Sequence, residues 1–230
     1  MAGYSTDLDN PIWNSLTTRH SHLAIGQGPV RRYPAEIAPF GAIGDPSEEA
    51  ATSLRSLFKP GERAGIASVI PEDWQGWQIH HQFEVIQYVW DQPSGTASPC
   101  SYAVRLQDEH LQAMFDLTAL VYPAYFRKGT AELGDYFGII QDGELCAMAG
   151  IRMAFHGHQE ISAVCTHPDH RGKGHARELT SHLVAYIENQ GDMAFLHTES
   201  DNLVAQKVYD GLGFTQRALL PIYVVDRLPD

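Results

Sequence analysis

The sequence predicts an α/β (α+β) fold, in which strands alternate with amphipathic helices. Residues 164–187 place an apolar strand-like run before a short basic turn with two glycines, and a helical run follows that turn. An Asp142-Gly143 pair between two apolar runs, within residues 136–153, is the strongest short-range hairpin signal in the chain. Both hairpin-linked and helix-linked strands are therefore expected.

Composition narrows the class of protein. The 230 residues carry a net charge of −12, with 43% hydrophobic and 19% charged residues, as in a soluble globular protein. No apolar run approaches the roughly 20 residues that span a bilayer, so no membrane partner is expected. An acidic chain lacks the basic face of a general nucleic-acid binder, and it favours a cationic or neutral small partner. The first residues show no secretory leader, which predicts a cytoplasmic location.

The spacing of the secondary-structure signals changes near residue 100, from irregular to regular. The loop-like residues 91–99 are the expected boundary between an N-terminal α/β region, 1–99, and a second domain, 100–230. In the first region, residues 45–58 are typical of a helix with Asp45 or Ser47 as its N-cap. Residues 77–90 alternate as a long strand.

The elements of the second domain follow in regular order. Strands are predicted at 102–106, on both sides of Asp142-Gly143, at 160–167, 194–198 and 219–226. Helices are predicted at 108–126 until Pro123 interrupts the period, at 175–191 and at 201–213. The helix at 175–191 has an apolar stripe through Ala176, Leu179, Leu183 and Ile187, and Gly191 ends it.

Alternation along the strand at 160–167 predicts two faces. Glu160, Ser162, Val164 and Thr166 are expected on one face, and Ile161, Ala163 and Cys165 on the other. Pro168 stops this strand because it lacks the N–H that a ladder needs.

The basic turn that follows is shaped to hold an anion. Its residues are Arg171, Gly172, Lys173, Gly174, His175 and Ala176. They place unpaired backbone N–H groups at a helix N-terminus, behind side chains too small to obstruct them, and two cationic side chains add charge. Neither the Walker loop nor the dinucleotide-binding glycine pattern is present.

These residues resemble the acetyl-coenzyme A signature of the GCN5-related N-acetyltransferase (GNAT) superfamily. The pattern Gln/Arg-x-x-Gly-x-Gly/Ala is filled by Arg171, Gly174 and Ala176. A second pattern follows at the expected spacing, filled by Asn202, Ala205, Tyr209, Gly213 and Phe214. The resemblance covers residues 100–230 and is greatest to the FR47-like branch. It implies a central mixed, mostly antiparallel sheet flanked by helices, with residues 1–99 as a degenerate GNAT half.

The resemblance also implies a set of site residues. The backbone of Val164, Cys165 and Thr166 would pair with the pantetheine arm, and the amides from Arg171 to Ala176 would hold the pyrophosphate. Asn202 would contact the pantetheine or its thioester end. Tyr209 would serve as general acid to the departing thiolate, and an N–H near Val164 or Cys165 would polarise the thioester carbonyl. This chemistry needs acetyl-coenzyme A as cosubstrate, and neither a metal nor a covalent intermediate.

Other residues of the sequence leave alternatives open. Glu160 is the best carboxylate for a general base, weighed evenly against a solvated acid at a strand end, with His197, His167 or a water chain as further alternatives. The adjacent histidines His80 and His81 point to opposite faces of a strand, and no Cys/His set has zinc-site spacing. The three widely spaced cysteines predict reduced thiols, and Cys165 is expected to be a packing thiol rather than an acyl carrier.

The sequence therefore predicts an N-acetyltransferase. It would move an acetyl group from acetyl-coenzyme A to a primary amine of a small molecule or peptide, by direct attack in a ternary complex. The alternative is a non-catalytic acyl-coenzyme A-binding module, which has no chemical reason to keep the phenol of Tyr209. The acceptor, the acyl chain length and the oligomeric state, a homodimer included, stay open.

Overall fold

The computed structural model describes residues 4–123 and 126–229, which form two compact units. One unit comprises Met1–Val85 with Leu219–Asp230, and the other comprises Ile86–Ala218. Strands β4 (Trp77–Val89) and β10 (Thr215–Arg227) each begin in one unit and end in the other. The predicted boundary at 91–99 falls inside the second unit, and the division of function that it implies stays a prediction.

The second unit contains the mixed sheet that the sequence predicts, with strand order β10-β4-β9-β8-β7-β6-β5. From β5 to β8, each strand pairs antiparallel with the next one along the chain, whereas β8 and β9 are parallel. The strands are β5 (Val104–Leu106), β6 (Tyr136–Gln141), β7 (Glu144–Phe155), β8 (His158–Thr166) and β9 (Met193–Glu199). The helices are α3 (Leu111–Val121), α4 (His175–Glu188) and α5 (Leu203–Leu212), with 3₁₀ turns η3 (Asp108–His110), η4 (Thr130–Leu133) and η5 (Pro168–His170).

The hairpin predicted at Asp142-Gly143 is confirmed. It joins β6 to β7, and both turn residues have positive φ, 51° and 84°. This is the geometry of a two-residue turn whose twist matches that of the flanking strands, and Asp and Gly tolerate it best.

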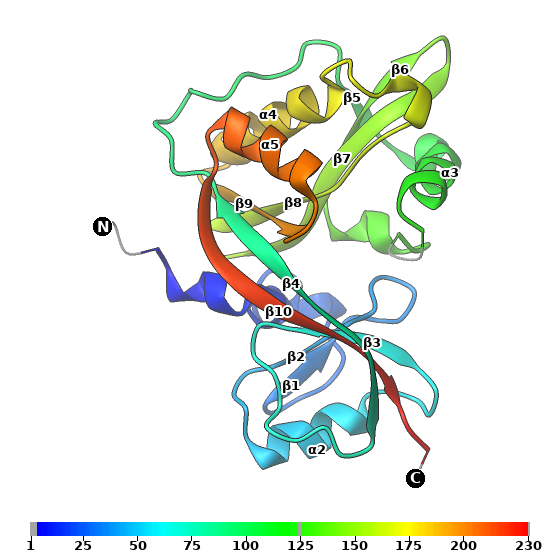
Figure 1. The fold of residues 1–230 in the computed structure, drawn as a ribbon, viewed down its shortest axis with the longest axis vertical. Coiled ribbons are helices and arrows are strands. Elements are labelled where there is room, and N and C mark those ends of the chain that lie inside the picture. The colour runs from blue at the N-terminus through cyan, green and yellow to red at the C-terminus, as the bar shows by residue number, and fades with distance from the viewer. Residues whose placement is uncertain (1–3, 124–125, 230) are drawn as a thin grey trace. The chain divides into compact units, whose positions relative to one another are not determined.

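Helices cover both faces of this sheet. Leu179, Leu183 and Ile187 of α4 are fully buried in a cluster that also includes residues of α5, which confirms the predicted stripe at these three positions. Ala176, its first predicted member, is only partly buried. Residues of α3 pack in a different cluster, against Met148 and Cys165. Figure 1 shows α4 and α5 next to each other and α3 apart from them. The two clusters therefore mark the two faces of the sheet.

The first unit holds more regular structure than the sequence indicated. Its strand order is β1-β2-β3-β10-β4, with β2 and β3 parallel and joined by α2. The elements are η1 (Thr6–Asp9), α1 (Pro11–Thr17), η2 (Ser21–Leu23), β1 (Val30–Arg32), β2 (Phe40–Ile43), α2 (Glu48–Ser56) and β3 (Arg63–Ala67). The helix α2 was predicted, and Ser47 is its N-cap, accepting the N–H of Ala50 at 3.2 Å. The other elements before β4 were not predicted.

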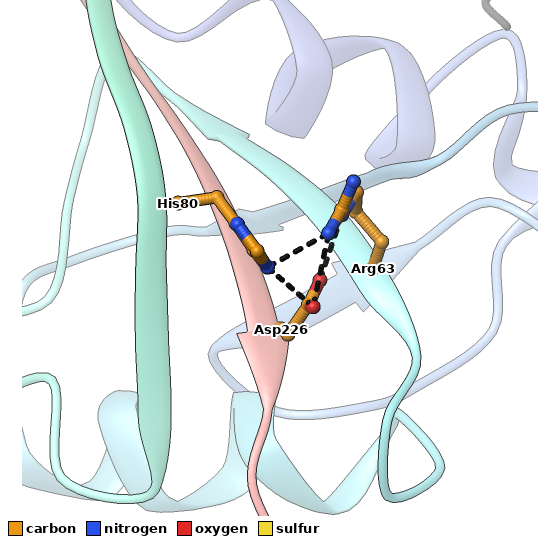
Figure 2. A network of polar contacts seen from close by, with 3 residues as sticks. All are labelled: Arg63, His80 and Asp226. Atoms are coloured by element: carbon orange, nitrogen blue, oxygen red, sulfur yellow. Dashed lines mark hydrogen bonds and ion pairs between the residues drawn. The ribbon is translucent and has the colours of Figure 1, made fainter.

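Three strands of the first unit are tied by an exposed polar network, which Figure 2 shows. Arg63 of β3 donates to Asp226 of β10 at 2.8 Å, and His80 Nε2 of β4 lies 2.7 Å from the same carboxylate. Hydrogen bonds from the Arg63 guanidinium lower the pKa of Asp226. Because these groups are solvated, they fix register more than they stabilise the unit.

Candidate active site

Strands β8 and β9 run parallel and then separate. Their registered pairs extend from His158 with Met193 to Ile161 with Leu196. β8 continues to Thr166 and β9 continues to Glu199, but within the described residues no later pair joins them. Backbone groups of β8 that face β9 beyond Ile161 are therefore left open. An extended ligand with its own amide groups can pair with such an edge.

A bulge in β8 lies at this opening. Ser162 pairs with Gly150 and Cys165 with Met148, so one extra residue is inserted in β8, and Ala163 has a φ of +51°. A bulge disrupts the ladder locally and re-aims the backbone. It also makes the predicted faces of the strand wrong. Ile161 and Val164 pack in the cluster of α4, whereas Ala163 and Cys165 pack in that of α3.

The basic turn follows the end of β8, as predicted. Gly172 and Gly174 have φ of +76° and +88°, and a Cβ added at either would meet nothing within 4 Å. Gly174 is the N-cap of α4 and offers no side-chain cap; the first bond inside the helix runs from the N–H of Glu178 to the Gly174 carbonyl. Arg171, Lys173 and both glycines are exposed. The open N-terminus of a 14-residue helix is thus presented among two cationic side chains, which suits a phosphate.

His175 of this turn differs from its neighbours, because its side chain is buried. Neither ring nitrogen has a hydrogen-bond partner among the residues that the structure describes. Burial lowers its pKa, and the charges of Lys173 and His170 lower it further. Both effects disfavour the imidazolium form, and His175 Nδ1 lies 3.8 Å from Glu178 Oε2.

Asn202 directly precedes α5 and Tyr209 lies within it, as the second pattern predicts. Asn202 is the N-cap, and its Oδ1 accepts the N–H of Ala205 at 3.1 Å, which leaves its amide N–H groups for a ligand. Tyr209 is buried in the cluster that includes Leu196, the last paired residue of β9, and Val164 packs against that cluster. Burial raises the pKa of the Tyr209 phenol, so the group stays protonated at neutral pH.

Glu160 lies within the sheet and is fully buried, so the alternative of a solvated acid is wrong. Arg152 donates to both of its oxygens at 2.8 and 2.6 Å, and His197 Nδ1 lies 2.7 Å from Oε1. Burial alone would raise the pKa of this carboxyl, but Arg152 and His197 outweigh burial and hold it at about 2. A carboxylate with so low a pKa is a weak base. The role of Glu160 as general base therefore stays a prediction, and its ion pair with Arg152 argues against that role.

Sequence reasoning did not find the ion pair of Glu160. Arg152 was not singled out, and His197 was named only as an alternative base. Each is a polar residue inside or at the end of an apolar strand, as in "GIRMAF" and "FLHT". A polar residue at a buried strand position needs a partner, and that was the signal available.

Cys165 is a packing thiol, as expected. It is buried against α3, and burial raises the pKa of its thiol to about 12. All three cysteines are free. Because the thiolate is the reactive form, we expect iodoacetamide at pH 8 to leave Cys165 unmodified in the folded protein and to alkylate it once the protein is denatured. Rapid native alkylation, read by peptide mass, would restore the acyl-cysteine alternative.

None of the helices in residues 4–123 and 126–229 has the length and apolar character needed to cross a membrane. In the same residues, His, Cys, Asp and Glu form no group of three or more that could hold a metal ion.

The chain is similar in sequence and fold to known acetyltransferases. The sequence model of the acetyltransferase (GNAT) family matches residues 66–214. A GNAT-family protein from Novosphingobium aromaticivorans has a TM-score of 0.90 and 28% identity, covering 98% of this chain and all of its own. A GCN5-related N-acetyltransferase from Kribbella flavida has a TM-score of 0.65 and 17% identity over 98% and 96% of the two chains, which shows the fold alone. No curated protein matches the chain significantly. Because the family model spans well over half of the sequence, this protein belongs to the GNAT family of acetyltransferases.

Proposed function

We propose that the protein transfers an acetyl group from acetyl-coenzyme A to a primary amine, by direct attack in a ternary complex. The observation that carries the proposal is one continuous path along β8. The strand opens beyond Ile161, bulges at Ala163 and leads into an exposed glycine turn at the N-terminus of α4. A long ligand with an anionic end and an amide-bearing arm suits both halves of that path.

The proposal gives roles to the residues of the β8 path and of α5. The turn from Arg171 to Ala176 holds the pyrophosphate through its amides, and the open edge at Val164, Cys165 and Thr166 pairs with the pantetheine. An N–H at the bulge, that of Val164, polarises the thioester carbonyl. Asn202 contacts the arm through its amide, and Tyr209 protonates the departing thiolate.

Features outside the site give the rest of the proposal. The motif spacing favours the FR47-like branch, and we place the enzyme in the cytoplasm as part of the same proposal. The first unit repeats a strand, helix and parallel strand in β2, α2 and β3, as a degenerate GNAT half would. The first turn of α2 carries Glu48 and Glu49, which repel a phosphate, so the proposed cofactor site belongs to the second unit alone.

A calorimetric titration with acetyl-coenzyme A, without acceptor, tests the proposal. Binding in the micromolar range is expected, followed by release of free coenzyme A when primary amines are supplied. Binding without release from any amine would favour the non-catalytic module. No binding would remove the proposed role of the turn.

A further inference from the structure

A row of polar side chains crosses the sheet of the second unit, with one residue from each of five neighbouring strands. In strand order they are Arg217 on β10, Gln87 on β4, His197 on β9, Glu160 on β8 and Arg152 on β7. Tyr88, Leu196 and Ile161 are the sequence neighbours of Gln87, His197 and Glu160, and they pack in the cluster of α4 and α5. Alternation therefore places these three members of the row on the opposite face of the sheet, and Arg217 and Arg152 join them through hydrogen bonds.

Each member of the row contacts the next. Arg217 Nη1 donates to Gln87 Oε1 at 2.7 Å, and Gln87 Nε2 lies 3.1 Å from His197 Nε2. His197 Nδ1 lies 2.7 Å from Glu160 Oε1, and Arg152 binds both oxygens of Glu160. The row is thus continuous across all five strands.

The direction of these bonds follows from the chemistry of the arginine. A guanidinium only donates, so Gln87 turns its oxygen to Arg217 and its N–H groups to His197. His197 Nε2 then accepts from Gln87, and Nδ1 carries the proton that is donated to Glu160. The Nε2 lone pair is occupied, and three N–H groups bind the carboxylate of Glu160, two of them from one guanidinium. An amine would have to displace the hydrogen bond of His197 Nε2, or compete with the guanidinium for the carboxylate of Glu160.

The row lies where β8 and β9 separate. The last registered pair is Ile161 with Leu196. Glu160 precedes that pair on β8, and His197 follows it on β9, so their hydrogen bond crosses the point of separation diagonally. Arg152 and Gln87 join the same two residues to the outer neighbours of β8 and β9.

We propose that Glu160 is a positioning residue for the acetyl donor. Together with its row it fixes the point at which β8 and β9 part, and so it sets the opening that receives the pantetheine arm. The inference rests on the proposed function, because that function assigns the opening to the pantetheine. The proton of the attacking amine passes to water rather than to Glu160 or His197.

Glu160→Gln separates positioning from base catalysis. The amide keeps the size of the side chain, but its NH₂ group faces donors of Arg152. We expect the dissociation constant of acetyl-coenzyme A, measured without acceptor, to rise about tenfold, with kcat at saturating donor lowered less than about fivefold. A general base would give the reverse: unchanged donor affinity and kcat lowered about 100-fold. That reverse result would overturn the proposal.

A second variant keeps the test valid if Glu160→Gln unfolds. Gln87→Leu removes the link between β4 and β9 and leaves Glu160 with its three hydrogen-bond donors. We expect the affinity for acetyl-coenzyme A to fall about threefold or more, with kcat little changed. An unchanged affinity for acetyl-coenzyme A would contradict the positioning role of the row. The matched control is Glu144→Gln, an exposed position at the start of β7, which should change neither quantity.

Amide hydrogen exchange makes the test independent of the ligand. Breaking the row should speed exchange in the paired segments His158–Ile161 and Met193–Leu196, and leave the β6–β7 hairpin unchanged. If the wild type fails to bind acetyl-coenzyme A but exchange responds in this way, the proposed function is wrong, and the inference that the row stabilises the pairing of β8 with β9 is supported. Unaltered exchange rates in both variants would exclude that stabilisation.

Discussion

Gly174→Glu should abolish binding of acetyl-coenzyme A while the protein stays folded. The substitution puts a carboxylate at the N-cap of α4, into open space beside the amides that would face the pyrophosphate. A like charge at that point repels phosphate, and the side chain fills the room that the ligand needs. We expect no measurable binding at ligand concentrations about 100 times the wild-type dissociation constant, in a calorimetric titration.

The chain supplies a matched control at the other end of the same helix. Gly191 follows α4, has a φ of +80°, and also has open space where a Cβ would lie. Replacing either glycine by glutamate forces an L-residue into the left-handed region, at about 1–2 kcal/mol of unfolding free energy. The two variants should lose similar stability in urea unfolding, but Gly191→Glu should bind the donor normally. Equal affinities in the two variants would refute the phosphate role of the turn.

The features that the sequence predicted correctly depend on local signals. The turn at Asp142-Gly143 needs only two residues with positive φ, and the apolar stripe of α4 is enough to predict a helix there. In the site, the order strand, glycine turn and helix was visible for the same reason. Ser47, one of the two N-caps predicted for α2, caps it through a bond to an N–H only three residues away.

The features that were missed depend on contacts between distant segments. The short strands β1, β2 and β3 are stabilised by pairing within the first unit, and a run of three to five residues has too little alternation to be recognised. The bulge at Ala163 changes the face of every later residue of β8, because one inserted residue reverses a period of two. Of the two partners of Glu160, Arg152 lies eight residues away on the preceding strand β7, whereas His197 is 37 residues away on β9 and only the fold brings it close.

Tyr209→Phe should lower turnover by about 100-fold or more and leave the affinity for acetyl-coenzyme A almost unchanged. The phenylalanine ring keeps the contacts that Tyr209 makes with Tyr88 and Phe214, at centroid distances of 5.7 and 6.1 Å. Only the hydroxyl is lost. The departing thiolate then lacks a proton donor, which slows the chemical step but not the binding of the donor.

The raised pKa of Tyr209 gives this prediction a second part. Burial, with a smaller contribution from Tyr88, disfavours the phenolate, so the acid form persists above the ordinary range of a tyrosine. The wild-type rate should therefore show no loss from tyrosine ionisation between about pH 7 and pH 10.

A phenol elsewhere in the same unit is the control for Tyr209→Phe. Tyr186 of α4 donates its hydroxyl to Asp135 and is only partly buried. Tyr186→Phe removes that hydrogen bond, at about 1 kcal/mol of stability, and should keep the wild-type kcat. If Tyr209→Phe also turned over normally, the hydroxyl of Tyr209 would have no catalytic part, and the proton of the thiol would come from water. Loss of donor affinity in Tyr209→Phe would instead make the residue part of the wall that binds the acetyl donor.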